Sequence, residues 1–95
     1  MNLSSLEKGL IVLEQLAKPP YQYSVMELSQ ATGLNRTTVY RLLYGLKSQD
    51  LVARVGGQKK FKLGSKTYHL GSVYLRNFST DDFVPQILNE ISKKT

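Results

Sequence analysis

The chain has 95 residues, of which 41% are hydrophobic, so its length allows one small domain and an appended helix. It contains no cysteine, which excludes a disulfide framework and a thiolate metal site. Its apolar stretches are too short for a membrane span or a signal segment. Together these features predict a cytoplasmic protein with no membrane partner.

Positive charge is concentrated in the middle of the chain. The formal net charge is +6, and the segment from Arg36 to Lys66 contains eight basic residues and one acid, Asp50. That segment therefore sums to +7 and the rest of the chain to −1. A merely solvated surface usually mixes both signs, so this stretch favours contact with a polyanion over the solvated alternative.

The first predicted helix runs from a capping box at residues 4–7 to Lys18, where Pro19-Pro20 stops it. Its spacing predicts an inward face of Leu3, Leu6, Leu10, Leu13 and Ala17, widened by Val12 and Leu16. Ile11 falls on the opposite, polar face, where it is either an ordinary isolated apolar residue or a contact for a partner helix. Residues 21–23 are short and extended, enough for a one-rung strand.

Residues 24–46 predict a helix-turn-helix. A capping box at 24–27 begins its first helix, and Gly33 ends that helix because glycine adopts a left-handed conformation without a Cβ clash. Asn35 is a natural N-cap for the second helix. The positions expected to face inward are Leu28, Ala31, Leu34, Val39, Leu42, Leu43 and Leu46.

The other stripe of the second helix is polar and basic, as expected of a helix that lies in the major groove of DNA. It consists of Arg36, Thr37, Thr38, Tyr40, Arg41 and Tyr44. The two arginines are the best candidates for base or phosphate contacts, and the threonines and Tyr40 are candidates for phosphate and base-edge contacts. For either tyrosine, and for Tyr44 in particular, packing beneath the following hairpin is the alternative.

A β-hairpin is expected after the helix-turn-helix. Residues 51–55 and 60–63 favour strands, and the glycine-containing turn at 56–59 joins them. A hairpin in this place is a wing, and Gln58, Lys59 and Lys60 at its tip suit a phosphate strand or the adjacent minor groove.

Two more helices are expected towards the C-terminus. The first extends from Ser65 or Lys66 to Asn77. Its apolar positions are Leu70, Val73 or Tyr74, and Phe78. Asp82 can cap the second, which is amphipathic.

Enzyme chemistry finds little support. His69 is the single histidine and has no set of acidic or thiol partners, so a surface or packed role is expected, with no metal and no cofactor. Winged helices also serve as protein-protein or RNA-binding modules. A protein-protein module would need an apolar outer face on the second helix of the motif. An RNA-binding module more often uses aromatic side chains on a sheet, so duplex DNA is favoured.

The segments SLEKGLIVLEQLA, ELSQATGLNRTTVYRLL, LVARVGGQKKFKLG and LGSVYLR together resemble the N-terminal domain of the IclR family of prokaryotic transcriptional regulators. The resemblance implies a dimer that binds a palindromic operator, typically as a repressor. It also implies a C-terminal effector-binding domain, so a small-molecule effector would act only through a domain outside these 95 residues. The helix at 66–77 corresponds to the family's linker, which forms the dimer contact with the first helix.

The sequence is thus interpreted as a mostly α protein, with a winged helix-turn-helix of three helices and a small hairpin at 1–65. A linker and dimerisation helix follows at 66–78, and 79–95 would be the start of an effector domain or a tail helix. The predicted DNA-binding residues are Ser24, Asn35, Arg36, Thr37, Thr38, Tyr40, Arg41, Tyr44, Lys47, Gly57, Gln58, Lys59 and Lys60. The predicted dimerisation residues are Ile11, Leu70, Tyr74 and Phe78.

Overall fold

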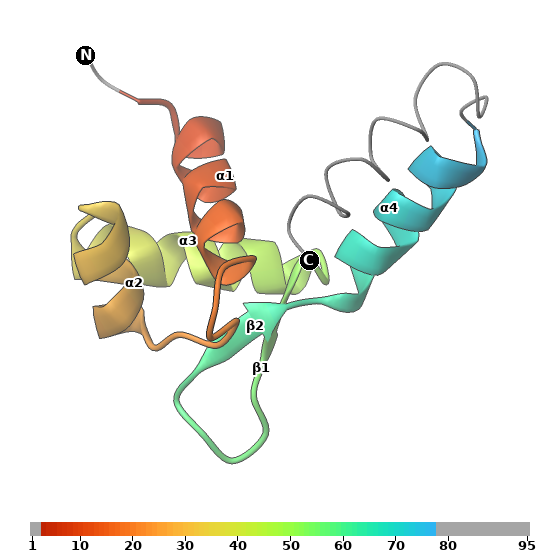
Figure 1. Cartoon of the computed structure of the whole chain (residues 1–95). Coiled ribbons are helices and arrows are strands. Elements are labelled where there is room, and N and C mark those ends of the chain that lie inside the picture. Colours follow the sequence, from red (N-terminus) through yellow and green to blue (C-terminus); the bar gives the residue numbers. More distant parts are fainter. Residues whose placement is uncertain (1–2, 78–95) are drawn as a thin grey trace.

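Within residues 3–77, four helices and one hairpin follow one another (Figure 1). The computed structural model describes residues 3–77. The elements are α1 Ser5–Leu16, α2 Val25–Thr32, α3 Arg36–Ser48, β1 Val52–Arg54, β2 Phe61–Leu63 and α4 Ser65–Arg76. This order confirms the predicted winged helix-turn-helix and the helix after it. Phe78 and the amphipathic helix expected after Asp82 lie outside the described residues.

The helix boundaries come from local capping, as the sequence predicts. At the start of α2, the backbone N–H of Ser24 donates to Glu27 Oε1 at 2.8 Å, and Ser24 Oγ accepts from the Glu27 backbone at 3.1 Å. The same reciprocal box opens α1 at residues 4–7. Gly33 ends α2 with a φ of 81°, and Asn35 caps α3. The turn between α2 and α3 is therefore fixed by its own side chains.

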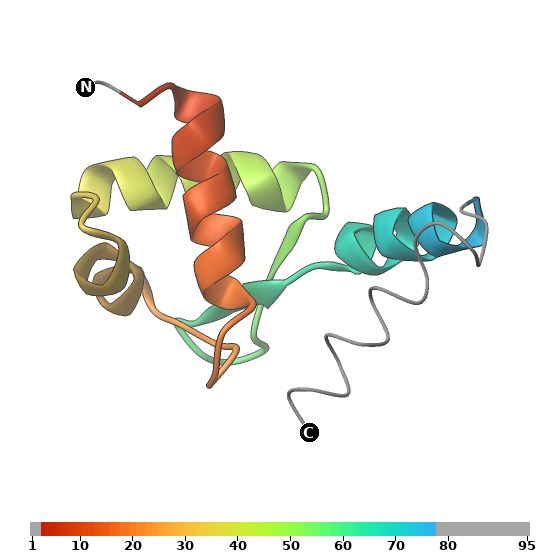
Figure 2. The same ribbon diagram turned by 45° about the horizontal axis from the view of Figure 1, so that its top comes forward.

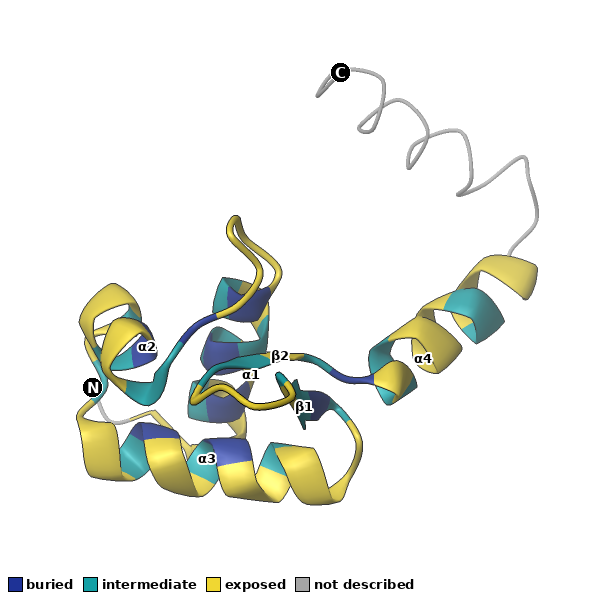
Figure 3. Ribbon diagram, turned by 90° about the horizontal axis from the view of Figure 1, so that it is seen from below, coloured by how far each residue is buried: buried dark blue, intermediate teal, exposed yellow. Residues whose placement is uncertain are grey.

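The core lies where α1, α2, α3 and the hairpin meet. Figure 2 shows α1 crossing over α3, and Figure 3 shows the buried residues on the inner sides of the helices. The buried hydrophobic residues are Val12, Leu16, Tyr23, Leu28, Val39, Leu43 and Val52. The predicted inner stripe of α3 is confirmed, since Leu42 and Leu46 also pack against this core.

The predicted inner face of α1 is confirmed for Leu13 and for the widening residues Val12 and Leu16, and is wrong for Leu3, Leu6, Leu10 and Ala17, which are exposed. Leu6 is 74% exposed and Leu10 51% exposed, whereas Val12 and Leu16 are completely buried. The buried side of α1 carries Gly9, Val12 and Leu16, and Gly9 on this side faces Leu42 of α3. Ile11, expected on an exposed polar face, is partly buried instead.

Two smaller expectations also differ from the structure. Helix α1 ends at Leu16 rather than Lys18, because Ala17 already leaves the helical conformation before the prolines. Ala31, expected to face inward, is exposed, since α2 is short and buries only Leu28 completely.

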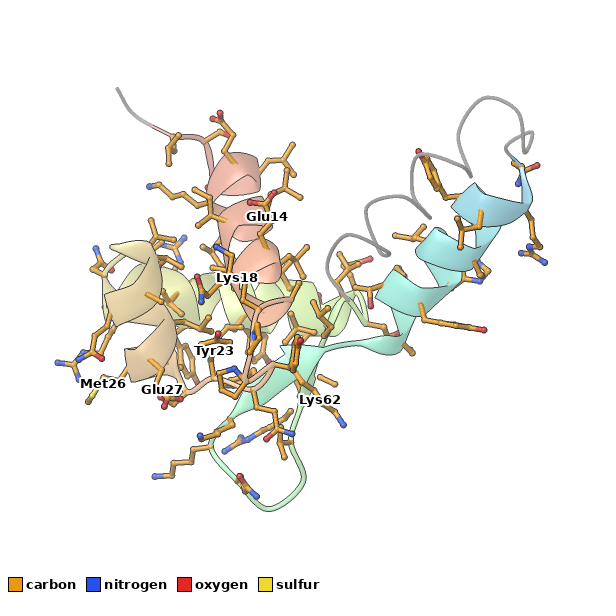
Figure 4. All side chains as sticks on the ribbon, viewed as in Figure 1. Glu14, Lys18, Tyr23, Met26, Glu27 and Lys62 are labelled. Atoms are coloured by element: carbon orange, nitrogen blue, oxygen red, sulfur yellow. The ribbon has the colours of Figure 1, made fainter. Side chains whose placement is uncertain are left out.

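The hairpin is shorter than predicted, with Val52 paired to Leu63 and Arg54 to Phe61. Tyr23 adds the expected single rung by pairing with Phe61 through two backbone hydrogen bonds of 3.0 and 2.8 Å. The Tyr23 hydroxyl donates to the Pro19 carbonyl at 2.7 Å, and the side chain lies between α1 and the hairpin (Figure 4). This tyrosine therefore ties the hairpin to the end of α1.

Helix α4 leaves the hairpin and points away from the other helices (Figures 1 and 2). Its beginning is fixed by backbone contacts: Lys66 N–H donates to the Asp50 carbonyl at 3.0 Å, and a Cβ on Gly64 would overlap that same carbonyl group. None of its residues is fully buried, and Tyr68 and Leu70 are exposed apolar side chains. The helix thus carries exposed apolar side chains.

Candidate nucleic-acid interface

The outer face of α3 presents two parallel lines of side chains. Arg36, Tyr40 and Tyr44 are spaced four residues apart and line a groove with the hairpin, while Thr37 and Arg41 form the second line. Of this second line, Arg41 also lies beside α1. Tyr40 is 60% exposed and Tyr44 71% exposed. The alternative in which one tyrosine packs beneath the hairpin is therefore wrong, and both rings are open to a ligand.

A groove of about 620 Å³ runs between α3, the start of α2 and the hairpin. Four basic residues line it, and we call it the basic groove: Arg36 and Lys47 from α3, and Arg54 and Lys59 from the hairpin. Tyr40, Tyr44, Met26 and Phe61 supply its apolar parts. Within residues 3–77, no acidic residue lines it. A groove of this composition suits a chain of phosphates with flat or apolar groups between them.

The loop of the wing, residues 55–60, presents Gly57, Gln58 and Lys59 at its exposed tip. Gly57 has a φ of 73°, a conformation that glycine adopts without strain. Lys60 is placed differently from the prediction: its ammonium lies 3.7 Å from Glu27 Oε1, so it faces α2. Lys59 is therefore exposed at the tip of the wing, whereas Lys60 joins the base of the wing to α2.

The other predicted contact residues lie around this site. Ser24 lines the basic groove and Lys47 lies at its far end, but the side-chain oxygens of Ser24 and Asn35 accept backbone hydrogen bonds in the helix caps. The backbone N–H of Thr38 is the donor in the second cap. Ser24 and Asn35 therefore position α2 and α3, and their contacts with DNA stay predictions.

Glu27 is held in its charged form. The backbone N–H of Ser24, followed by the Lys60 ammonium, lowers the pKa of this carboxyl below its ordinary value of 4.5. Glu7 has a lowered pKa for the same reason at the start of α1, but through Ser4 alone. The two capping glutamates thus differ in one respect, namely the lysine that joins Glu27 to the wing.

Replacing Glu27 with glutamine is expected to weaken the acid dependence of stability. A glutamate with a lowered folded-state pKa stabilises the fold above pH 4.5, and this contribution is lost as the pH falls through the folded-state pKa. Glu27→Gln keeps an acceptor for Ser24 but has no charge, so it should melt at a lower temperature near pH 7 and lose less on acidification. Glu7→Gln is the matched control, and the neutral-pH loss should be larger for Glu27→Gln. Equal melting curves from pH 7 to pH 3 for both variants would contradict a role of the Lys60 pair.

Two groups of predicted residues lie away from the basic groove. Leu70 and Tyr74 are exposed positions of α4, and their part in dimerisation stays a prediction. On α1, however, the exposed apolar residues are Leu6 and Leu10 rather than Ile11. Both leucines line an apolar hollow of about 310 Å³ between α1 and α3, which we call the α1–α3 hollow.

Sequence reasoning missed Arg54, Met26 and Phe61 as residues of the site. Arg54 is the last residue of β1 and pairs with Phe61, so both come to the groove through the register of the hairpin. The sequence did contain a signal for Arg54. It is a basic residue directly after two apolar ones, at the point where the strand meets the wing turn. Within the described part of the chain, no cluster of acidic or histidine side chains could hold a metal ion. In the same part, no helix is long and apolar enough to cross a membrane.

Three helices with a hairpin beside the second helix of a helix-turn-helix define a winged helix-turn-helix domain. Residues 5–56 match the IclR helix-turn-helix domain, and the chain belongs to the IclR family. This confirms the resemblance seen in the sequence.

Relatives and solved structures agree with this assignment. The transcriptional repressor IclR of Escherichia coli K12 is 29% identical over 93 residues, covering 98% of this chain and 34% of that protein. The transcriptional regulator KdgR of Dickeya chrysanthemi is 34% identical over 76 residues, covering 80% and 25%. The structure of Thermotoga maritima IclR matches with a TM-score of 0.67 and 27% identity over 96% of this chain and 36% of the other.

An IclR-family regulator from Brucella abortus gives a TM-score of 0.72 with 26% identity, covering 81% of this chain and 29% of its own. The chain therefore spans about a quarter to a third of the length of these relatives. Three of the four are named as transcriptional regulators or repressors, in agreement with the interpretation of the sequence.

Proposed function

We propose that this chain is the DNA-binding module of a transcriptional regulator, with α3 as the recognition helix and the hairpin as its wing. The observation that supports this most is the basic groove, in which Arg36, Lys47, Arg54 and Lys59 converge from two elements. Such convergence on one side, with exposed polar side chains beside it, is what a duplex with a charged backbone requires.

Two surfaces would contact the DNA in different ways. Thr37, Tyr40 and Arg41 on the exposed side of α3 would meet base edges in the major groove, where arginine can bind guanine with two hydrogen bonds. The basic groove would hold the phosphate strand that borders the major groove, and Lys59 would follow the backbone beyond it. The base contacts then determine which DNA sequence is bound, and the phosphate contacts fix the position of the protein on the duplex.

The module would act as a homodimer on a palindromic operator. Support comes from two exposed apolar surfaces outside the basic groove: the α1–α3 hollow with Leu6 and Leu10, and α4 with Tyr68 and Leu70. A symmetric dimer presents two recognition helices to two half-sites, so the preferred sequence is palindromic. The relatives named as repressors support repression as the outcome, with an effector bound outside these residues.

The experiment that tests this function starts from a library of random duplexes. Sequences retained by the protein are enriched, and fluorescence anisotropy then compares the best sequence with a scrambled one at a fixed salt concentration. A palindromic preference that exceeds binding to the scrambled duplex is expected. Equal binding to both duplexes would contradict operator recognition.

Removing either arginine from the recognition helix should weaken operator binding without unfolding the domain. Arg36 and Arg41 are both exposed, so Arg36→Ala and Arg41→Ala should melt as the parent does. If an arginine binds a guanine with two hydrogen bonds, its loss costs about 1–3 kcal/mol and relaxes the preference at one base pair. Lys8→Ala, on α1, is the control. Unchanged affinity of both arginine variants would show that another surface contacts the operator.

A further inference from the structure

The Arg54 side chain contacts two parts of the wing. Its Nε–H donates to the backbone carbonyl of Gln58 at 3.2 Å, across the turn that joins the two strands. Its guanidinium carbon also lies 6.0 Å from the centre of the Phe61 ring, on the neighbouring strand. The side chain therefore contacts both the tip of the wing and its base.

These contacts restrict how the wing can move. The Gln58 peptide is held on both sides, because its N–H donates to the Val55 carbonyl at 3.1 Å and its C=O accepts from Arg54. Gly57, just before it, is exposed and has no side chain to pack. Lys59 thus lies between two hydrogen-bonded residues, since the Lys60 carbonyl accepts from the Val55 N–H at 2.9 Å. Of the bonds on either side of Lys59, the Arg54 bond is the one made by a side chain.

Arg54 also has donors left for a ligand. A guanidinium has five N–H groups, and only the Nε–H is used by the protein within residues 3–77. The side chain lines the basic groove together with Lys47 and Lys59, so its terminal N–H groups are at a surface where anions would gather. A planar pair of such groups matches two oxygens of a phosphodiester.

We propose that Arg54 both positions the wing and binds a backbone phosphodiester lying in the basic groove, so that the wing is ordered around the DNA strand that it contacts. This inference rests on the proposed DNA binding and adds a residue with two linked tasks. Lysine supplies a charge but has no Nε–H beside two further donors, so only arginine performs both tasks at once.

The test compares Arg54→Lys and Arg54→Ala with Lys62→Ala. Lys62 is an exposed residue of the same hairpin, but it lies on the side facing the start of α4, opposite Met26 and Glu27 (Figure 4). In the free protein, NMR relaxation of the Gln58 and Lys59 amides should show a less ordered wing for both Arg54 variants and no change for Lys62→Ala. This measurement needs no DNA.

With a mixed-sequence duplex, Arg54→Ala should weaken binding roughly tenfold or more and reduce the salt slope by at least about 0.9. Arg54→Lys should recover only part of the affinity. Adding Lys59→Ala to Arg54→Ala should cost less than Lys59→Ala alone, since Lys59 is already displaced.

Two results would overturn the inference while leaving the proposed function intact: full recovery of affinity and wing order by Arg54→Lys, or an Arg54→Ala variant that behaves as Lys62→Ala does. No binding of any duplex by the parent chain would instead overturn the proposed function, and with it the phosphate contact. In that case the NMR relaxation of the Gln58 and Lys59 amides would decide by itself whether Arg54 positions the wing.

Discussion

Leu43→Ala is expected to lower the free energy of unfolding by about 2–5 kcal/mol. Leu43 is 1% exposed and lies on the inner stripe of α3, in the core shared by the three helices and the hairpin. Truncation removes apolar contacts and leaves a cavity that rigid helices fill only in part. The loss is a large fraction of the 5–15 kcal/mol typical of a whole domain, so urea unfolding followed by circular dichroism should detect it directly.

The next residue along the helix is the matched control. Tyr44 is 71% exposed, so Tyr44→Ala should leave the unfolding curve almost unchanged and weaken DNA binding instead. The two neighbouring substitutions therefore separate the stabilising face of α3 from its binding face. If Tyr44→Ala unfolds the domain, or if Leu43→Ala leaves its stability intact, the division of α3 into these two faces is wrong.

The helix-turn-helix could be predicted because its information is local. Ser24 with Glu27, Gly33 and Asn35 each determine a helix end through contacts within a few residues, and the inner stripe of α3 repeats at helical spacing. The wing was predicted for the same reason, since a glycine-containing turn between two β-prone segments is a short-range signal.

The face of α1 could not be predicted in this way. Leucines and valines occur on several sides of this helix, so spacing alone allows more than one inward face. The face that packs on α3 is the one with Gly9, Val12 and Leu16, and this choice depends on the partner helix. The basic groove likewise depends on tertiary packing. Arg54 and Lys47 line the same groove because the hairpin folds back beside α3. The Glu27–Lys60 pair likewise joins residues far apart in sequence.

The corrected face of α1 changes how dimerisation should be tested. Leu10 is 51% exposed and lines the α1–α3 hollow, whereas Ile11 is partly buried within its own protomer. An aspartate at Ile11 would disturb folding and association together. An aspartate at Leu10 places a charge in the hollow without opening the core, so it is the sharper probe of the proposed dimer.

Leu10→Asp is expected to convert the proposed dimer into a monomer and to reduce binding to a palindromic operator by about 10²–10⁴-fold. The reason is that two linked recognition helices, about 34–36 Å apart or a multiple of that, bind their half-sites as one unit, and a monomer loses this gain. Arg41 lines the same hollow, so a carboxylate at Leu10 also acts on half-site binding. The effect of losing the dimer is therefore the additional loss on the palindrome beyond the loss on a single half-site. Sedimentation gives the oligomeric state, and anisotropy gives the two affinities. Tyr21→Asp is the control, since Tyr21 is an exposed apolar residue outside the hollow and should leave both measurements unchanged. A Leu10→Asp protein that sediments as a dimer and keeps its preference for the palindrome would rule out the α1–α3 hollow as the dimer contact.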